Sequence, residues 1–573
     1  MKLSDYIVSF LIEKEITDVF GYPGGMVTHL MDSFEKYKSS IAAHVNYHEQ
    51  ASAFCACGYG QVSNKPGIAY ATSGPGATNL ITGIANAYFD STPCIFITGQ
   101  VNTYEAKNEL EVRQKGFQET DIVSIVKPIT KYAVQIKAAE DIRYELEKAF
   151  QISIDGRSGP VLIDIPMNIQ RAEVNPESLK QYVHDKEGKQ QNNAKDIILK
   201  ALYDAKKPVI LGGHGVTSSG LIREFRTFIE LVGAPVVTSM TGKEIIPTDN
   251  EQNFGFIGAY GDRCANFIIS NCDLIISIGS RMDCRQTGNN LDIFSTRAKI
   301  IRIDADEQEV KHKIKPDEIG IIADLRNLLP QLLGSEFKTR DKNVNWLNSC
   351  RKIKEKLKNV DRQDETEMLR KLSVLIPKDA VITTDVGQNQ VWVAQAFNIK
   401  EEQRVLFSGG HGAMGYSLPA AIGAYYASNK NVICFNGDGG LQMNIQELQF
   451  IARENIPIKI VLLNNSSLGM IRHFQEMYFE SKFVQTKQEY GYTVPKFEAI
   501  ARAYELDYLK VESLQDIDNC KELIENDKPC FIEICLNDTT YVFPKLAMDR
   551  PIFDQDPLLE RELFDELMEI CNE

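Results

Sequence analysis

Short apolar runs alternate along this chain with segments whose apolar residues recur at helical spacing. The clearest example combines an apolar run at 431–435, helical spacing over 441–455 and a second apolar run at 458–463. This pattern predicts a strand, a helix and a second strand. A right-handed crossover makes such strands parallel, so Asp438 and Asn465, which follow the two strands, are expected at the same edge of one sheet.

The same alternation divides the chain into three units of one class. We predict an α/β fold with three doubly wound parallel-sheet domains, at residues 1–174, 194–334 and 366–545, followed by an acidic C-terminal tail at 546–573. The polar stretch 175–193 is expected to be a linker. The sequence shows no fixed-period repeat, which argues against a solenoid.

Composition and charge narrow the class of protein. Of the 573 residues, 43% are hydrophobic and 25% are charged, which is typical of a soluble globular protein. The formal net charge of −15 argues against a nucleic-acid or anionic-membrane partner. No apolar stretch reaches the roughly 18 residues of a membrane span, and residues 1–15 indicate an amphipathic helix rather than a signal peptide, so we expect a cytoplasmic protein. The 12 cysteines lack a zinc-type spacing and are expected to be buried.

The residues after the two strands have the chemistry of a metal site. Asp438 offers a carboxylate oxygen and Asn465 an amide oxygen, and the backbone carbonyl near Ser467 is a third candidate ligand for one hard cation such as Mg²⁺. Three glycines, Gly437, Gly439 and Gly440, would let a diphosphate approach the backbone. The alternative is a glycine-rich turn without function; the paired asparagines 27 positions after Asp438, within one strand–helix–strand unit, favour the site.

A second candidate lies near the N-terminus. Glu49 is the charged residue that ends a predicted strand at 41–49, and it begins a helix of small residues. In isolation it would be a first-turn glutamate favoured by the helix dipole. The strand and turn at 67–79, with Gly74 and Gly76 around Pro75, add a second glycine turn to the same domain.

Several ordered motifs together resemble the large catalytic subunit of acetolactate (acetohydroxyacid) synthase. They are YPGG at 22–25, HEQ at 48–50, ATSGPGATNL at 71–80, ITGQV at 97–101, GFQETD at 116–121, TDVGQ at 384–388, SGGHGAMGYSLPAAIGA at 408–424, and GDGGLQMNIQEL followed by LLNNSSLGMIR. The resemblance runs in order over nearly the whole chain.

The resemblance implies a pyrimidine-binding, a central and a diphosphate-binding domain, with thiamine diphosphate (ThDP), Mg²⁺ and FAD as cofactors. It implies that ThDP lies between the first domain of one subunit and the third domain of another. A homodimer would then be the smallest active unit; homotetramers and a regulatory small subunit are further expectations. The substrates implied are pyruvate and a carbonyl acceptor.

The resemblance also assigns residues. Glu49 takes the position of the glutamate that hydrogen-bonds N1′ of the aminopyrimidine, and Gln118 and Phe117 take the other catalytic positions. Met414 matches the residue that bends the cofactor, although core packing would explain a methionine equally well. The positions matching ThDP contacts are Pro23, Gly24, Gly25, Glu49, Thr72, Pro75, Asn79, Gly387, Gln388, Gly410, His411, Gly412, Met414, Gly437, Asp438, Gly439, Gly440, Asn465, Ser467, Leu468, Gly469 and Met470.

The segment SRMDCRQTG at 280–288 is similar to the flavin-contacting segment of the family. The positions matching FAD contacts are Gly213, Gly258, Gly261, Gly279, Arg281, Asp283, Arg285, Asp304 and Asp324. In the synthases FAD is mostly structural. Ordinary helix caps and surface ion pairs are the alternative interpretation of these residues.

The residues expected around the acceptor depart from the family pattern. Phe474 replaces a tryptophan, Met26 an alanine, Ala259 a methionine, Tyr260 a histidine, Met167 a lysine and His411 a leucine. Loss of the lysine removes a cation that a carboxylate acceptor would use. The C-terminal segment is weakly similar to acetolactate synthase-like proteins of sugar pathways, so the identity of the acceptor stays open.

These observations lead to one functional prediction with alternatives. We expect a ThDP-dependent carboligase that decarboxylates pyruvate and transfers the two-carbon unit to a carbonyl acceptor, first of all to a second pyruvate. One alternative acceptor is a keto-sugar nucleotide or another ketone. A pyruvate oxidase or decarboxylase is a further alternative, and a non-catalytic subunit is disfavoured because Glu49, Asp438 and Asn465 are all present.

Overall fold

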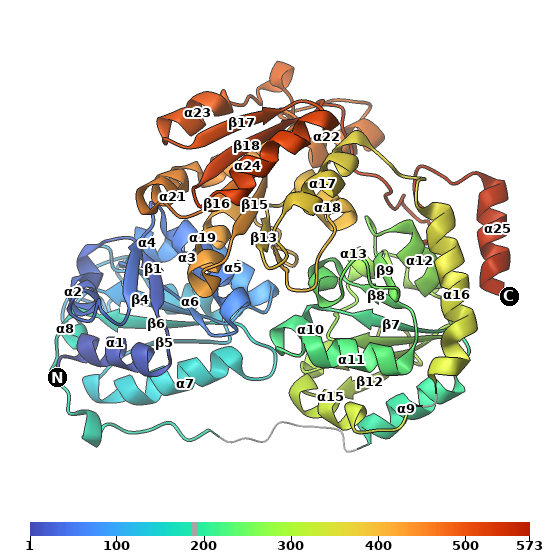
Figure 1. Cartoon of the computed structure of the whole chain (residues 1–573). Coiled ribbons are helices and arrows are strands. Elements are labelled where there is room, and N and C mark those ends of the chain that lie inside the picture. Colours follow the sequence, from blue (N-terminus) through green and yellow to red (C-terminus); the bar gives the residue numbers. More distant parts are fainter. Residues whose placement is uncertain (185–192, 338, 573) are drawn as a thin grey trace.

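Three six-stranded parallel sheets, each covered by helices, make up the chain (Figure 1). The computed structural model describes residues 1–184, 193–337 and 339–572. The predicted α/β class with three parallel sheets is confirmed. Part of the predicted linker 175–193 lies outside the described residues.

The first sheet has the strand order β2-β1-β3-β4-β6-β5. Its strands are β1 (Asp18–Gly21), β2 (Ala42–Val45), β3 (Gly67–Ala71), β4 (Cys94–Gln100), β5 (Tyr132–Gln135) and β6 (Pro160–Pro166). The longer helices around it are α1 (Leu3–Glu13), α2 (Thr28–Lys36), α3 (Glu49–Ser63), α5 (Ile81–Phe89) and α7 (Ile142–Ile154). Every residue of β3, β4 and β6 is buried, as expected for parallel strands covered on both faces.

The second sheet has the order β12-β11-β10-β7-β8-β9. Its strands are β7 (Pro208–Gly212), β8 (Val236–Thr238), β9 (Asn253–Phe256), β10 (Leu274–Ile278), β11 (Lys299–Asp304) and β12 (Ile319–Ile322). Its main helices are α9 (Ala194–Asp204), α11 (Ile222–Val232), α12 (Arg263–Ser270), α15 (Leu325–Leu333) and α16 (Arg340–Leu357). A 3₁₀ segment, η5 (Met240–Ile245), follows β8.

The third sheet has the order β14-β13-β15-β16-β18-β17. Its strands are β13 (Val381–Thr384), β14 (Arg404–Phe407), β15 (Val432–Gly437), β16 (Ile458–Asn464), β17 (Asp507–Val511) and β18 (Cys530–Cys535). Its helices include α17 (Asp364–Leu375), α18 (Gln388–Ala396), α19 (Ser417–Ser428), α20 (Asp438–Met443), α21 (Leu448–Glu454), α22 (Gly469–Tyr478), α23 (Phe497–Ala503) and α24 (Cys520–Glu525).

The helix expected at 441–455 is not continuous, so that prediction is wrong. The chain forms α20, the 3₁₀ turn η7 (Ile445–Glu447) and then α21. Asn444 has φ of −133°, and its side-chain amide donates to the Gly415 carbonyl at 2.8 Å and to Gln50 Oε1 at 3.2 Å. Asparagine side chains offer such alternatives to helical bonding, which explains the break.

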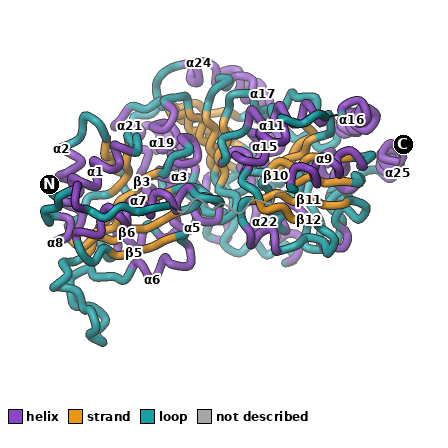
Figure 2. The backbone as a smooth tube through the Cα atoms, turned by 90° about the horizontal axis from the view of Figure 1, so that it is seen from below, coloured by secondary structure: helices purple, strands orange, loops and turns teal. Residues whose placement is uncertain are grey.

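Helices α3 and α19 join the first and third domains by direct backbone contact (Figures 1 and 2). A Cβ added at Gly58 would lie 2.1 Å from the Ala420 carbonyl oxygen, and one at Gly423 would lie 1.8 Å from the Cys55 carbonyl oxygen. Both positions therefore require glycine.

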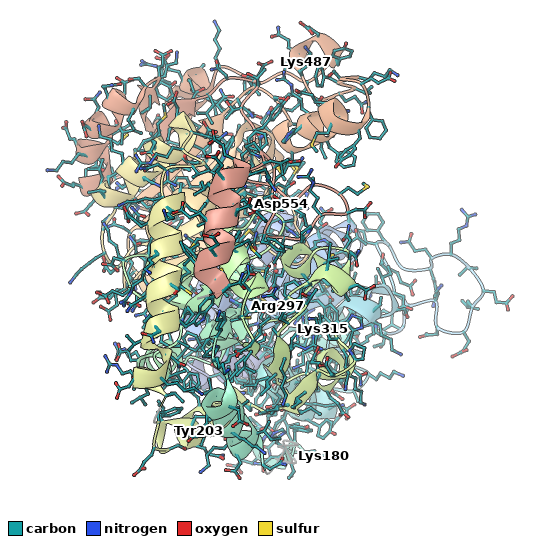
Figure 3. All side chains as sticks on the ribbon, turned by 90° about the vertical axis from the view of Figure 1, so that its right-hand side faces the viewer. Lys180, Tyr203, Arg297, Lys315, Lys487 and Asp554 are labelled. Atoms are coloured by element: carbon teal, nitrogen blue, oxygen red, sulfur yellow. The ribbon has the colours of Figure 1, made fainter. Side chains whose placement is uncertain are left out.

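The C-terminal segment ends in α25 (Arg561–Asn572), which lies beside α16 at one side of the molecule (Figure 3). Its buried residues Leu567, Ile570 and Cys571 pack into the same core as Trp346 and Cys350 of α16. The segment predicted as a tail thus completes the core of the central domain. No helix among the described residues is long and apolar enough to cross a membrane.

Candidate active site

Asp438 and Asn465 meet at one edge of the third sheet. Strands β15 and β16 are parallel, with Gly437 opposite Leu463, so the residue after each strand emerges at the same edge. The Asn465 N–H donates to Asp438 Oδ2 at 3.1 Å. Both side chains are buried, and the predicted juxtaposition of the two residues is observed.

The oxygens at this edge suit a hard cation. Burial raises the pKa of Asp438 to about 6, against the opposing effect of its hydrogen bonds. The Ser467 N–H donates to Asn465 Oδ1 at 3.3 Å, and Asn465 Nδ2 donates to Gln388 Oε1 at 2.8 Å. No group of three or more His, Cys, Asp or Glu side chains suited to a metal occurs among the described residues. A cation here would need phosphate or water oxygens to complete its shell, which is how Mg²⁺ is commonly held.

We call Asp438, Asn465, Ser467 and Gln388 the Asp438 cluster. Its glycine neighbours leave no room for side chains: a Cβ at Gly440 would lie 2.2 Å from Asp385 Oδ1, and one at Gly469 would lie 1.8 Å from Gln388 Oε1. The remaining predicted cofactor residues of this domain lie in the same region. A Cβ added at Gly439 would lie 2.7 Å from Leu468 Cδ2 and 3.2 Å from Met414 Cε. Gly437 is the N-cap residue of α20, and Gly387, with φ of 138°, is the N-cap residue of α18. Met470 is the second residue of α22 and is half-buried.

Glu49 occupies a second cluster, in the first domain. It is the first residue of α3 and is 8% exposed. Asn79 Nδ2 donates to Glu49 Oε2 at 2.9 Å, and a Cβ at Gly76 would lie 3.1 Å from Oε1. The bond from Asn79 fixes the carboxylate against α4 (Pro75–Asn79), which begins at Pro75.

The other predicted residues of the first domain lie around the same turns. Gly24, between Pro23 and Gly25 in the loop after β1, would place a Cβ 2.3 Å from Thr72 Cβ. The Met26 N–H donates to Thr72 Oγ1 at 3.1 Å. Gln118 adopts φ of 62° and lies against Gly74, where an added Cβ would be 2.9 Å from the Gln118 Cβ. The neighbouring Phe117 is 78% exposed. Backbone strain of this kind is common at functional turns.

Within one chain, a clasp from the third domain holds the turn before Glu49. Glu447 Oε1 accepts from the Tyr47 N–H at 2.8 Å, and Oε2 accepts from Asn46 Nδ2 at 3.0 Å. Burial raises the pKa of Glu447 to about 7. Among the described residues, no hydrogen bond joins Glu49 directly to the Asp438 cluster.

Sequence reasoning missed Glu447, Asn444 and Tyr492 as site residues. Tyr492 donates from its hydroxyl to Asp438 Oδ1, from a loop 54 positions away. Glu447 and Asn444 belong to the quoted motif GDGGLQMNIQEL, so a polar pair interrupting an otherwise apolar helical pattern was the available signal. Nothing in the sequence pattern singled out Tyr492.

The predicted flavin residues surround a pocket at the carboxyl ends of the second sheet, which we call the central pocket. Its lining includes Gly279, Arg281, Asp283, Arg285, Asp304 and Asp324, together with Ala259 and Tyr260. The three remaining predicted flavin residues, Gly213, Gly258 and Gly261, are in close contact with neighbouring backbone. A Cβ added at Gly213 would lie 2.2 Å from the Gly279 carbonyl oxygen, and one added at Gly258 would lie 2.2 Å from the Arg285 carbonyl oxygen. A Cβ added at Gly261 would lie 2.6 Å from the Gly258 nitrogen. The pocket has a volume of about 170 Å³, below the roughly 300–1,000 Å³ of typical ligand sites.

The loop at 409–412 reaches this pocket from the third domain. Gly410 lines it, and its N–H donates to Asp90 Oδ1 at 2.6 Å. The His411 ring stacks on Phe89 with centroids 5.5 Å apart, and partial burial lowers its pKa. Gly412 adopts φ of 70°.

The four predicted acceptor residues come from all three domains. Met26 and Met167, the first residue of α8 (Met167–Gln170), belong to the first domain, and Ala259 lines the central pocket. Phe474 on α22 is 49% exposed and has Tyr478 as a ring neighbour at 4.8 Å. Their common role at an acceptor stays a prediction.

Comparison with known proteins gives this arrangement its class. The N-terminal, central and C-terminal domain models of thiamine pyrophosphate enzymes match residues 1–125, 196–332 and 385–534. The chain therefore belongs to the thiamine pyrophosphate enzymes, thiamine pyrophosphate being another name for ThDP.

Within that class the chain is similar to acetolactate synthase large subunits. It is 36% identical to the subunit of Lactococcus lactis over 99% of this chain and 98% of the relative. It is 35% identical to a probable large subunit of Methanocaldococcus jannaschii over 100% and 98%, and 32% identical to the isozyme 2 large subunit of Escherichia coli over 95% and 97%.

Proposed function

We propose that this enzyme decarboxylates pyruvate and transfers the two-carbon unit to a carbonyl acceptor, with a second pyruvate as the first candidate, giving 2-acetolactate and CO2. The observation that carries the proposal is the pair of clusters around Asp438 and Glu49, each built from residues that the resemblance assigns to ThDP. The names of the relatives support the same reaction.

The residues of the two clusters would have two roles: the Asp438 cluster anchors the cofactor, and Glu49 exchanges a proton with it. Asp438, Asn465 and the carbonyl of Ser467 would hold Mg²⁺, and the glycine-lined edge would admit the diphosphate. Bound ThDP supplies the carbon nucleophile and accepts the electron pair that CO2 leaves behind. Glu49, fixed by Asn79, would hold a proton at the pyrimidine N1′.

We propose a homodimer or homotetramer in which Glu49 of one copy faces the Asp438 cluster of another. The support is that Phe117 and Tyr104, on the loop beside the Glu49 cluster, are 78% and 63% exposed and leave apolar surface for a second copy. A regulatory small subunit is proposed because the relatives are named large subunits. A cytoplasmic location is proposed from the sequence alone.

FAD is proposed for the central pocket on the resemblance of residues 280–288. The chemistry of the lining is suitable, since arginines and the glycine-lined backbone can meet a diphosphate. The present volume of about 170 Å³ is too small for a dinucleotide, so binding requires lining side chains to move. The flavin absorbance of the purified protein tests whether FAD is bound.

A second acceptor class is favoured by two positions. Met167 removes a cation that a carboxylate acceptor would use, and Phe474 presents a smaller ring than the tryptophan of the family on an exposed helix face. Both changes would suit a keto-sugar nucleotide or another larger ketone.

The test is product identification with labelled pyruvate, Mg²⁺ and ThDP, with and without a panel of ketones. Labelled acetolactate from pyruvate alone supports the first candidate, and a labelled branched sugar that appears only with a sugar ketone supports the second. Acetaldehyde as the sole product indicates a decarboxylase, and bleaching of flavin absorbance by pyruvate indicates an oxidase; either result rejects the proposed transfer.

A further inference from the structure

A second cavity, of about 660 Å³, lies apart from the central pocket and the Asp438 cluster. We call it the β9–α17 cavity. It is bounded by β9, by the end of α16 and by α17, with Phe543 and Pro544 also in its lining. Figure 1 shows α17 and α18 above β9 and α12, with α16 at their side. Its volume falls within the range of small-molecule sites.

The lining of the β9–α17 cavity carries more basic than acidic side chains, although the whole chain has a formal net charge of −15. Several of the basic groups already have partners. Arg263 pairs with Asp361 at 2.7 Å, and Lys354 Nζ donates to the Asn253 carbonyl at 2.7 Å. These contacts hold the walls of the cavity together and leave few cations free.

Lys243 is the exception. It lies in η5 and lines the cavity, and within residues 1–184, 193–337 and 339–572 its ammonium group has neither a hydrogen bond nor an ion pair. Burial lowers its pKa, and the nearby cations Arg370 and Lys354 act in the same direction. Among the neighbouring charges Asp262 has the largest effect and raises the pKa, although in the described part of the chain it forms no ion pair with Lys243 and its Oδ2 accepts from the Phe256 N–H at 2.9 Å. A partly buried cation without a partner is costly unless an anion accompanies it.

We infer that the β9–α17 cavity is an effector site for a small organic anion, whose carboxylate or phosphate group pairs with Lys243. Arg370 of helix α17 also lines the cavity, with its guanidinium paired to Glu367 at 2.6 Å. Phe254 and Leu357 in the lining offer apolar contact to the carbon skeleton. The lining can therefore meet both the charged group and the carbon skeleton of a small organic anion.

Helix α18 links the β9–α17 cavity to the Asp438 cluster. Gln395, near its C-terminal end, lines the cavity, and Gln388, its first residue, accepts from Asn465 Nδ2 at 2.8 Å. If α18 moves as a unit, a shift at Gln395 reaches Gln388 and, through Asn465, the residues that would hold the diphosphate and its metal; the third test below measures this coupling.

A second link reaches the central pocket. Met240 and Thr241 of η5 line the central pocket while Lys243 of the same turn lines the β9–α17 cavity, and Phe256 lines both. Gln395 Nε2 also donates to the carbonyl of Tyr260, whose side chain lines the central pocket. The two links are contiguous contacts from Lys243 to the central pocket and to the Asp438 cluster, and we expect the link to the Asp438 cluster to couple the anion to Mg²⁺–ThDP binding.

The first test uses the wild-type protein and needs no turnover. Amine acetylation of Lys243 is followed by mass spectrometry with millimolar citrate, inorganic phosphate or chloride at equal ionic strength. We expect citrate or phosphate to slow labelling of Lys243 at least about threefold relative to chloride. The anion that protects better shows whether the site prefers a carboxylate or a phosphate group. Exposed Lys200 on α9 is the internal control and should be unaffected. Equal labelling of Lys243 in all three salts overturns the site.

The second test uses variants and calorimetry with the same two anions. Lys243→Met is expected to weaken binding by about tenfold or more, because a charge-assisted contact is lost, and Lys243→Arg to retain most of it. Lys200→Met is the matched control. Unchanged affinity in a folded Lys243→Met protein contradicts the assignment. If that variant does not fold, the labelling experiment on the wild-type protein is the deciding test.

The third test measures coupling. The affinity for Mg²⁺–ThDP, followed by intrinsic fluorescence, should change by about fivefold or more when the anion is saturating, and this change should vanish in Lys243→Met. Anion binding without any such change would reject the effector role. None of these measurements requires acetolactate to be formed, so they remain informative if the proposed reaction is wrong.

Discussion

The Tyr492 hydroxyl donates a hydrogen bond to Asp438 Oδ1, the carboxylate oxygen that Asn465 leaves free. A cation held by Asp438 would compete with this hydroxyl for the carboxylate. Because a buried carboxylate must be hydrogen-bonded or paired, Tyr492 satisfies it in the protein without metal.

Tyr492→Phe removes this donor. We expect the cofactor-free protein to lose about 1–2 kcal/mol of stability, since hydrogen bonds to charged groups contribute about 1.5–3 kcal/mol and Tyr492 is partly exposed. Affinity for Mg²⁺–ThDP should rise, because the hydroxyl no longer competes. Thermal unfolding with and without Mg²⁺–ThDP measures both effects.

Tyr490→Phe is the matched control, since that tyrosine is 48% exposed on the same loop. An equal loss of stability in the free and the loaded protein would show that Tyr492 has only a packing role.

Glu49→Gln should lower the rate of exchange of the ThDP C2 proton by about 10²–10⁴-fold, because a neutral amide cannot share a proton with N1′. Asn79→Ala should have a smaller effect, about tenfold, because Glu49 stays but loses the donor at 2.9 Å that orients it. Proton exchange is measured by NMR on the loaded protein. Near-normal exchange in Glu49→Gln would mean that Glu49 has been assigned wrongly.

The Glu447 clasp should make stability depend on pH. Its pKa is about 7 in the folded protein against an ordinary value of 4.5, so the folded state binds more protons and stability falls as pH rises from 4.5 through 7. Between pH 6 and pH 8 the ionisation of Glu447 alone should lower the free energy of unfolding by about 1 kcal/mol. Glu447→Gln should remove that part of the pH dependence, and an amide could donate to Asn46 Oδ1, which is buried without a partner.

Urea unfolding at pH 6 and pH 8 tests the clasp, with the exposed Glu454→Gln as control. Identical pH dependence in Glu447→Gln and wild type would show that Glu447 is ionised throughout this range.

Leu567→Ala in α25 should destabilise the central domain by about 2–5 kcal/mol, because Leu567 is fully buried against the core that includes Trp346. Glu562→Ala, in the first turn of the same helix, should have little effect. Limited proteolysis of the 340–357 region measures the loosening. Equal protease resistance in the two variants would mean that α25 contributes no stability.

The sequence pattern predicted the three sheets and the meeting of Asp438 with Asn465, because both follow from local periodicity and crossover handedness. It could not predict the clasp, since Glu447 and Asn46 are 401 positions apart and neither belongs to a spacing rule. The packing of α25 against α16 was missed for the same reason, because an amphipathic pattern predicts an apolar helix face but not the element that packs against it. The roles of Glu49, Gln118 and the acceptor residues remain predictions from resemblance.

The crossing of α3 and α19 at Gly58 and Gly423 has a consequence for motion during turnover. Two helices whose backbones touch at these glycines have little freedom to slide or rotate against each other, so the crossing opposes relative motion of the first and third domains of one chain. We expect opening and closing for substrate entry to involve peripheral segments, such as the loop bearing Gln118 and the one bearing Tyr492, more than rotation of these two domains.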